Sequence, residues 1–335
     1  MDSNYTYMVC VKCMTFNHHA FIEDAMNGFV IQQTDFPFVC VIVDDASTDG
    51  ESEVIKKYLH SNFDLTENLE TDDYVMNFGQ HKNNRNCYFA VLFLKFNHYS
   101  IKKSKLSYYS KWQDNSKYIA YCEGDDFWIH SHFLRYSVDF LEINVNYSAV
   151  YGNRISCNCD ATKFRKNIFL KELDIQDIMS GCNMGLRNLC MRRDIYKIKT
   201  SSSLDLDIYL KCMKSGYLKY INDDFAVYRL TGEGVATSRS NEQRYYYCFK
   251  DYYRLHKDTQ FIYQKYLVKY QIGLVIRGLL KRNIGIKQSV QLLRLYHVPS
   301  TKRFIWYIYF IISFCLGIGI FFHKKTKEVP FIKHN

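Results

Sequence analysis

Two acidic clusters in the sequence each follow a run of apolar residues at its carboxyl end. These clusters are Asp44 and Asp45 after residues 38–43, and Glu123, Asp125 and Asp126 after residues 117–122. An apolar run that stops at carboxylates is typical of a buried strand that ends in a turn. In an open α/β sheet, ligands bind beyond the carboxyl ends of the strands, so these five side chains are expected to face one crevice.

Carboxylates gathered in this way repel one another unless a cation joins them. Hard divalent cations prefer carboxylate oxygens, and Mg²⁺ typically takes one or two carboxylates together with substrate phosphates. The sequence therefore predicts a site for Mg²⁺ or Mn²⁺ that holds a nucleotide diphosphate. The competing interpretation is that the acids serve only as turn residues and helix caps. Gly124 among three acids, followed by Phe127 and Trp128, is unusual for a simple turn.

The segments around these turns alternate between strand-like and helix-like patterns. The expected strands are residues 7–14, 38–43 and 117–122, and the expected helices are residues 20–30, 51–60, 85–112, 132–143 and 206–214. This alternation predicts an α/β fold with a mostly parallel central sheet flanked by helices. Thr48 and Glu51 form a capping-box pattern at the start of the second helix.

Positive charge is concentrated at the C-terminal end of the chain. Residues 236–335 contain 18 Lys and Arg against 4 Asp and Glu, whereas the preceding residues contain 26 against 30. Such a basic region indicates either nucleic acid or an anionic membrane surface as a partner. Residues 241–298 predict basic amphipathic helices, and residues 304–322 are 19 residues without a charge. The uncharged run argues against nucleic acid and favours membrane attachment, as a span or as an interfacial or re-entrant segment.

The N-terminal residues and the cysteines indicate a reducing compartment. Residues 1–8 lack the apolar core of a secretory signal peptide. The 12 cysteines are therefore expected to be free thiols.

Three of these motifs, taken in order, resemble those of the family-2 glycosyltransferases with the GT-A fold, especially bacterial members that build surface polysaccharides. The matching stretches are Met14–Asn17, Val43–Gly50 and Tyr121–Trp128. In that family the first two turns hold the base and ribose of a nucleotide sugar. The third is the acidic motif that contacts the ribose and the cation on the diphosphate. The resemblance covers about residues 7–235, and the three motifs are specific only together.

The resemblance implies a role for each matching side chain. The nucleotide-sugar-binding residues it implies are Thr15, Asn17, Asp44, Asp45, Glu123, Asp125 and Arg229, and the metal ligands are Asp126 and Asp125. Asp205 and Asp207 compete for the position of the catalytic base, and the spacing to Gly216 and Tyr228 favours Asp205. For Arg229, a structural ion pair is the alternative to a contact with the diphosphate.

The implied activity is transfer of a sugar from a nucleotide-sugar donor, most commonly a UDP-sugar, in polysaccharide biosynthesis. A hydroxyl of a saccharide or lipid-linked acceptor attacks the donor in a single displacement with inversion, and Asp205 takes the hydroxyl proton. Two other functions use the same motifs. A metal-dependent nucleotidyl- or phosphotransferase needs the carboxylates but no base near Asp205, and a membrane-attached protein that only binds nucleotide sugars needs no base at all.

Together these features predict a three-part organisation. Residues 1–235 are expected to form a GT-A glycosyltransferase domain, residues 236–300 a basic amphipathic helical region, and residues 301–335 a hydrophobic membrane-associated segment with a basic tail. The expected location is the cytoplasmic face of the inner membrane, because the donor is made in the cytoplasm.

Overall fold

The computed structural model describes residues 5–179, 182–198, 205–232, 240–260, 262, 264–280, 282–295 and 324–329 of the chain. Its centre is a nine-stranded sheet with the order β12-β8-β11-β6-β1-β2-β5-β4-β3. The strands of this sheet are β1 Tyr7–Thr15, β2 Phe38–Asp44, β3 Phe63–Glu70, β4 Tyr74–His81, β5 Cys87–Leu94, β6 Ser116–Tyr121, β8 Tyr147–Tyr151, β11 Leu189–Arg192 and β12 Tyr217–Tyr220. Strands β6, β1, β2 and β5 run parallel in the middle, and β4 and β11 pair antiparallel on either side of them.

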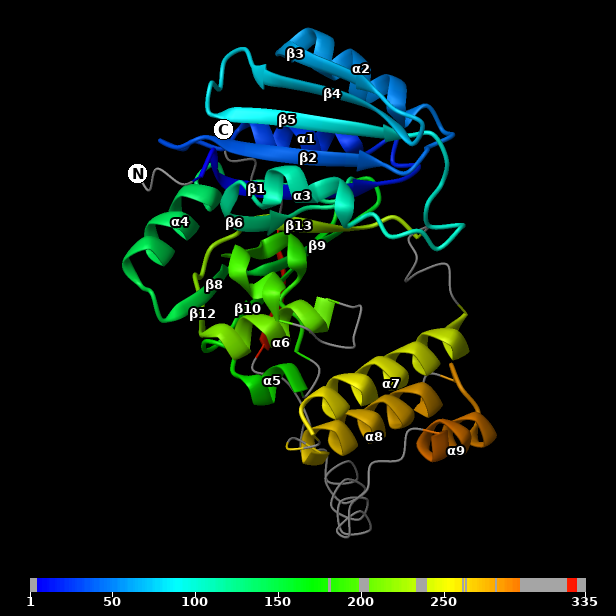
Figure 1. The fold of residues 1–335 in the computed structure, drawn as a ribbon. Helices are drawn as coiled ribbons and strands as arrows, with labels where there is room; N and C mark the ends of the chain where they lie inside the picture. Colours follow the sequence, from blue (N-terminus) through cyan, green and yellow to red (C-terminus); the bar gives the residue numbers. More distant parts are fainter. Residues whose placement is uncertain are drawn as a thin grey trace.

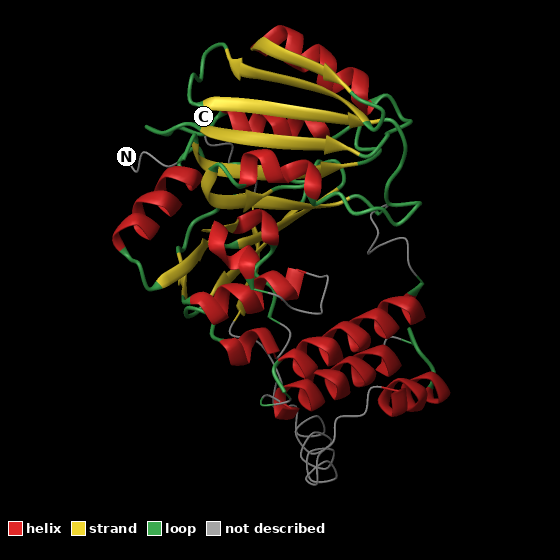
Figure 2. Ribbon diagram, in the orientation of Figure 1, coloured by secondary structure: helices red, strands yellow, loops and turns green. Residues whose placement is uncertain are grey.

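Helices cover both faces of the large sheet (Figure 2). The helices are α1 Ile22–Val30, α2 Glu51–Asn62, α3 Ser107–Gln113, α4 Phe133–Ile143, α5 Ile175–Met179, α6 Asp205–Ser215, α7 Asn241–Asp258, α8 Gln264–Leu280 and α9 Ile286–Leu295, with the short 3₁₀ helices η1 Leu186–Asn188 and η2 Arg193–Lys197. Side chains of α1, α2 and α4 pack on one face, and those of α3, α5 and α6 pack on the other. This layered arrangement is why the central strands are mainly apolar on both faces.

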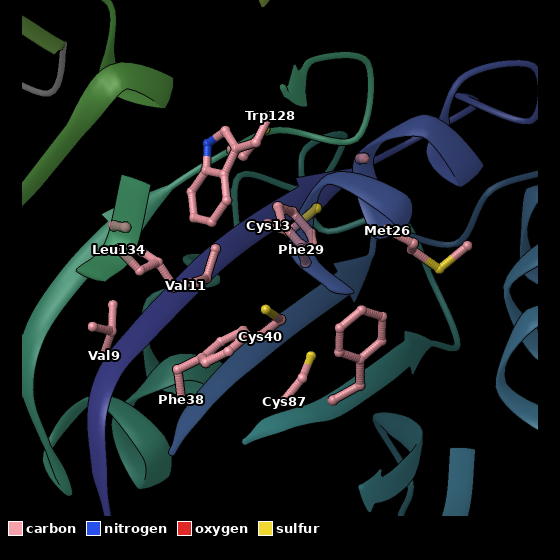
Figure 3. Close-up of a cluster of buried hydrophobic side chains, with 14 of the residues drawn as sticks. Val9, Val11, Cys13, Met26, Phe29, Phe38, Cys40, Cys87, Trp128 and Leu134 are labelled. Atoms are coloured by element: carbon pink, nitrogen blue, oxygen red, sulfur yellow. The ribbon is translucent and has the colours of Figure 1, made fainter. Parts of the chain in front are cut away.

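The main core lies between β1, β2, β5 and the helix α1. In Figure 3, Val9, Val11 and Cys13 project from β1 towards the side where Phe29 and Trp128 lie. The rings of Phe29 and Trp128 meet edge to face with their centroids 5.2 Å apart. Truncating a buried aromatic side chain of this kind costs about 3–5 kcal/mol of stability. This core fixes the first strand, and with it the turn that follows Thr15.

A second, five-stranded sheet has the order β14-β10-β9-β13-β7. Its strands are β7 Phe127–Trp128, β9 Arg154–Asn158, β10 Phe164–Phe169, β13 Ala226–Leu230 and β14 Lys324–Val329. Strand β7 immediately follows the acidic cluster and pairs with β13, so residues near Arg229 come next to the cluster. Strand β14 pairs antiparallel with β10 although more than 150 residues separate the two strands.

Helices α7, α8 and α9 form a group beside the sheets (Figure 1). Ser240 and Gln243 make a reciprocal capping box at the start of α7. Phe249, Val275, Ile284 and Leu292 form the small core between the three helices. The predicted helical character of this part of the chain is confirmed for the described residues.

The uncharged run of residues 304–322 lies outside the described residues. Among the residues that the structure does describe, no helix is both long enough and apolar enough to cross a membrane. The described cysteines are free thiols, as the sequence predicted.

Two local predictions were wrong. Residues 85–112 do not form one helix: Cys87–Leu94 is strand β5, and only Ser107–Gln113 is helical. The strand forms because its backbone pairs with β2 and β4 on either side, and its apolar side chains are then buried in the cores on the two faces of the sheet. The capping box of Thr48 and Glu51 is also absent, because the carboxylate of Glu51 turns towards the end of β1.

Candidate active site

Three turns meet at the carboxyl ends of the parallel strands β1, β2 and β6. The chain leaves β1 to form β2 on one side and later returns to form β6 on the other side. The position between β1 and β6 is therefore a topological switch point, where open α/β sheets bind their ligands. The acidic residues that follow β6 lie at this position.

The acidic turn packs directly against the end of β1. The Gly124 N–H donates to the Met14 carbonyl at 3.0 Å. A Cβ added to Gly124 would lie 2.1 Å from the Thr15 hydroxyl oxygen and 2.6 Å from the Thr15 Cβ. Only glycine allows this approach, because any side chain at Gly124 would push the turn away from β1.

The end of β1 is joined to the end of β2 through Glu51. The Thr15 hydroxyl donates to the Glu51 carboxylate, which also accepts from the His18 N–H at 2.8 Å and the Ser47 hydroxyl at 2.8 Å. Burial raises the pKa of Glu51, and its hydrogen bonds partly offset that effect. Thr15, a predicted ligand contact, is buried and uses its hydroxyl in this network.

Asn17 links the same two turns from the outside. It has a positive φ of 57°, and its amide oxygen accepts from the Thr48 N–H at 2.8 Å. Its own N–H donates to the Ser47 hydroxyl at 2.9 Å. Asn17 is exposed beside the switch point, so the structure places it at the rim of the site.

Asp44 and Asp45 are both buried and both bind protein groups. The Asp44 carboxylate accepts from the Ser47 N–H at 3.0 Å and from the Ser52 hydroxyl. The Asp45 carboxylate accepts from the His98 N–H at 2.7 Å and from the Tyr99 N–H at 3.1 Å. It also pairs with the Lys105 ammonium at 2.5 Å. Asp45 therefore fastens the loop 95–106 to the end of β2.

Glu123, Asp125 and Asp126 form the acidic centre of the site. Each offers a carboxylate oxygen, and these three atoms lie within 4.8 Å of one another. Desolvation by the surrounding protein raises the pKa of Glu123 to about 8, and the negative charges of Asp126 and Asp125 add to this effect. The Glu123 side chain is nevertheless exposed, so solvent screens part of the repulsion. A carboxyl group that is accessible and yet desolvated is expected in the wall of a concave site.

Arg187 neutralises part of this acidic charge. Its Nε donates to the Asp126 carboxylate at 2.5 Å, and its guanidinium stacks on the Tyr228 ring at 4.2 Å from the centroid. The other Asp126 oxygen accepts from the Arg229 N–H at 2.9 Å. Burial raises the pKa of Asp126 to about 6 despite these partners. Both oxygens of Asp126 are thus already engaged with protein donors.

Asp125 differs from Asp126 in having an oxygen without a protein partner. Its Oδ1 is buried and makes no hydrogen bond in the described structure. Its Oδ2 lies 3.9 Å from the His18 Nε2, which is an ion-pair distance only if that histidine is protonated. A buried carboxylate oxygen without a donor is costly, and a bound cation would satisfy it.

This donor set fits a hard divalent cation. Glu123 and Asp125 have oxygens that are not committed to protein donors, and Asp126 stands beside them within the same cluster. Carboxylate oxygens are the ligands that Mg²⁺ and Mn²⁺ prefer. The residues present therefore agree with the predicted metal site, with Asp125 better placed than Asp126 to supply a free oxygen.

Asp205 and Asp207 occupy different environments at the start of α6. Asp207 is buried and pairs with the Lys211 ammonium at 2.9 Å. Asp205 is exposed. Desolvation by the surrounding protein nevertheless raises its pKa, and the positive charges of Arg187 and Arg154 oppose that shift. The charge of Asp205 also acts on Glu123. Of the two acids, Asp205 is therefore the one whose charge acts on the acidic centre.

Arg229 is placed next to the site but is committed to protein partners. Its guanidinium donates to the Asp24 carboxylate at 2.5 Å, the Cys159 carbonyl at 2.9 Å and the Asp125 carbonyl at 3.1 Å. The side chain is only 4% exposed. This geometry favours the structural role that the sequence left open for Arg229.

Arg187 and Arg154 belong to the site, although no pattern in the sequence predicted them. Arg187 belongs to η1 and Arg154 begins β9, so neither lies in a recognisable motif. Burial lowers the pKa of Arg154, and the nearby positive charge of Arg187 lowers it further. Two neighbouring cations whose charges act on Asp205 suit an anionic ligand, but no spacing in the sequence could have indicated the pair.

Comparisons with known proteins agree with this architecture. No protein-family profile matches the chain. Uncharacterised proteins of Mycobacterium bovis and Mycobacterium tuberculosis are 22% identical over 240 residues, which is 70% of this chain and 62% of theirs. The chain thus spans less than two thirds of the length of these curated relatives.

Two solved structures share the fold. S. aureus TarS, residues 1–349 in complex with UDP-GlcNAc, has a TM-score of 0.55 at 14% identity and covers 86% of this chain and 80% of its own. The mannosyltransferase PcManGT from Pyrobaculum calidifontis, in complex with GDP-Man and Mn²⁺, has a TM-score of 0.50 at 12% identity and covers 94% and 82%. The predicted fold class is therefore confirmed: this is the mixed α/β fold of GT-A glycosyltransferases, with a large central sheet and flanking helices.

Proposed function

We propose that this chain is a nucleotide-sugar-dependent glycosyltransferase of the family-2 type that works with inversion in polysaccharide biosynthesis. The proposed donor is a UDP-sugar and the proposed acceptor is a saccharide or lipid-linked hydroxyl at the cytoplasmic face of a membrane. The likeness to structures bound to UDP-GlcNAc and GDP-Man supports a nucleotide-sugar donor.

One observation carries the proposal. Three carboxylates lie within 4.8 Å of one another at the switch point between the parallel strands β1 and β6, Arg187 pairs with one of them, and the charges of Arg187 and Arg154 act on Asp205. The carboxylates suit a cation, the arginines suit a diphosphate, and Asp205 suits a base. A protein that only binds nucleotide sugars would have no need of a base such as Asp205.

We assign the metal to Glu123 and Asp125, which have uncommitted oxygens, and we assign Asp126 to positioning through its bond with Arg187. When bound, the cation would counter the charge that develops on the leaving nucleoside diphosphate. Arg187 and Arg154, rather than Arg229, are the side chains proposed to contact the diphosphate. Their fixed positive charge is already oriented before the substrate binds.

Asp205 is the proposed general base. It accepts the proton of the acceptor hydroxyl as the hydroxyl oxygen forms a bond to the anomeric carbon and the bond to the diphosphate oxygen breaks. Arg187 and Arg154 favour the ionised form of Asp205, which is the form that accepts a proton. Asp207 cannot take this role without losing its pairing with Lys211.

The test is donor binding and slow donor hydrolysis by the purified protein. A panel of UDP- and GDP-sugars is screened with Mg²⁺ or Mn²⁺ for the wild type, Asp125→Asn and Asp205→Asn. We expect one donor to bind only with metal, Asp125→Asn to lose that binding, and Asp205→Asn to keep binding but lose transfer to an acceptor. If no nucleotide sugar binds the folded protein with either metal, the proposed function is wrong.

A further inference from the structure

The turn between α8 and α9 exposes an unusual group of apolar side chains. Leu280 is 66% exposed and Ile286 is 76% exposed, and Leu279 and Val290 beside them are also exposed. By contrast, Ile284 in the turn and Leu292 in α9 are buried in the small core. The outer side chains are therefore not needed to hold the three helices together.

Basic side chains surround this apolar group. Arg282 lies in the turn and Lys287 lies in the first turn of α9, and both are exposed. The sequence of α8, the turn and α9, residues 264–295, contains seven Lys and Arg and no Asp or Glu. No acidic residue occurs anywhere between Asp258 and Glu328. The helices α8 and α9 and the turn between them therefore contribute only positive charge, and acidic side chains can come only from neighbouring elements such as α7, which packs against both helices.

The pairing of apolar and basic groups selects among possible partners. A nucleic acid would use the positive charge but would gain nothing from exposed leucine and isoleucine side chains. An anionic bilayer uses both, because its headgroups attract Lys and Arg while its acyl boundary accepts apolar side chains. The chain that follows Leu295 continues into the 19 uncharged residues 304–322, which agrees with the same partner.

The position of this turn also suits a membrane substrate. In Figure 1, the arrowheads of β2 and β5 point to the right of the view, and α9 lies at the lower right, below the sheets. The candidate active site is at the carboxyl ends of the parallel strands, so α9 and the site lie towards the same side of this view but at different heights. A bilayer that contacts the turn would therefore lie at the α9 end of the molecule, on this same side.

We propose that the α8–α9 turn, formed by Leu279, Leu280, Arg282, Ile286, Lys287 and Val290, is a docking surface for an anionic lipid bilayer. This proposal rests on the proposed function and identifies the face of the protein that contacts the membrane. The binding itself does not depend on catalysis. It is tested separately from donor hydrolysis.

The experiment measures binding of the full chain to vesicles. Vesicles of phosphatidylcholine alone are compared with vesicles that contain phosphatidylglycerol, by co-sedimentation at low and high salt. We expect binding only to the anionic vesicles, weakened by salt. Arg282→Gln with Lys287→Gln should weaken it about thirtyfold, which corresponds to about 1 kcal/mol per removed charge. Leu280→Ser with Ile286→Ser should also weaken it.

Matched controls use exposed residues far from the turn. Lys57→Gln on α2 removes an exposed charge, and Ile143→Ser at the end of α4 removes an exposed apolar side chain. Both should bind vesicles as the wild type does, and all variants should hydrolyse the donor in solution at the wild-type rate. The proposal is overturned if the turn variants bind anionic vesicles normally, or if they lose affinity for duplex DNA or RNA and not for vesicles. Absence of donor hydrolysis by the wild-type protein would instead count against the proposed function and not against the docking surface.

Discussion

Adjacent acids in this site have different partners. Asp126 accepts hydrogen bonds from Arg187 and from the Arg229 N–H, whereas Asp125 has a buried oxygen without a donor. A motif read from the sequence treats the two acids as equivalent ligands. The structure separates them, because an oxygen that already accepts from an arginine is less available to a cation.

This difference predicts different phenotypes for two conservative variants. Asp125→Asn should abolish metal-dependent donor binding and leave the melting temperature nearly unchanged. Asp126→Asn should lower stability by roughly 3 kcal/mol, because it leaves the buried Arg187 charge without its partner. Calorimetric titration with Mn²⁺ and denaturant unfolding measure the two effects. Equal metal affinity in the wild type and Asp125→Asn would show that the ligand assignment is wrong.

Gly124 has a steric requirement that can be tested on its own. Gly124→Ala places a Cβ 2.1 Å from the Thr15 hydroxyl oxygen, so the acidic turn must move away from β1. We expect a loss of about 1–3 kcal/mol in unfolding free energy and a large loss of donor binding. Gly273→Ala is the control, because nothing lies within 4 Å of an added Cβ there. That variant should be neutral or slightly stabilising in the same unfolding assay.

At the scale of elements, Asp45 acts as an anchor for the loop 95–106. Asp45→Ala removes the acceptor for the N–H groups of His98 and Tyr99 and the partner of Lys105. Charge-assisted bonds of this kind contribute about 1.5–3 kcal/mol each, so amide exchange in the loop should rise at least tenfold. Hydrogen–deuterium exchange without any nucleotide measures this.

The control for the loop is Asp64→Ala. Asp64 lies on β3, and its substitution removes an exposed ion pair with Arg85. It should leave exchange at residues 98 and 99 unchanged. If Asp45→Ala also leaves that exchange unchanged, Asp45 is free to serve as the nucleotide contact that the sequence predicted.

The elements that the sequence predicted well are those with a single local explanation. Strands β1, β2 and β6 are mainly apolar runs that end at polar turns, which are acidic after β2 and β6, and α6 has a regular amphipathic pattern. Residues 87–94 are apolar throughout, a pattern that suits a buried helix as well as a buried strand, and only pairing with β2 decides between them. Arg187 reaches Asp126 across 61 residues of sequence, so its role depends entirely on tertiary structure.

For the whole molecule, His256 links stability to pH. It lies in α7, has no exposed surface, and burial lowers its pKa to about 4. The unfolded chain binds a proton near the ordinary histidine pKa of about 6.5, so the unfolded state gains protons first as the pH falls. Stability should therefore be complete above pH 6.5 and should decrease towards pH 4, by roughly 3 kcal/mol from this residue.

Urea unfolding from pH 7.5 to pH 4 tests this linkage. His256→Leu removes the titrating group, so the difference in stability between variant and wild type should change in favour of the variant as the pH falls. His60→Gln, at an exposed histidine on α2, should follow the wild type throughout. A constant difference between His256→Leu and the wild type over this range would contradict the expected linkage.

Strand β14 constrains how the chain can meet a bilayer. Lys324–Val329 pairs with β10 in the same body that carries the acidic centre, and α9 belongs to the helices beside it. Lys324–Val329 is therefore part of the body that carries the acidic centre, although it lies more than 150 residues beyond β10 in the sequence. Two strands of one hydrogen-bonded sheet cannot lie on opposite sides of a bilayer. With β14 in place, Lys324–Val329 and the acidic centre must therefore share one compartment.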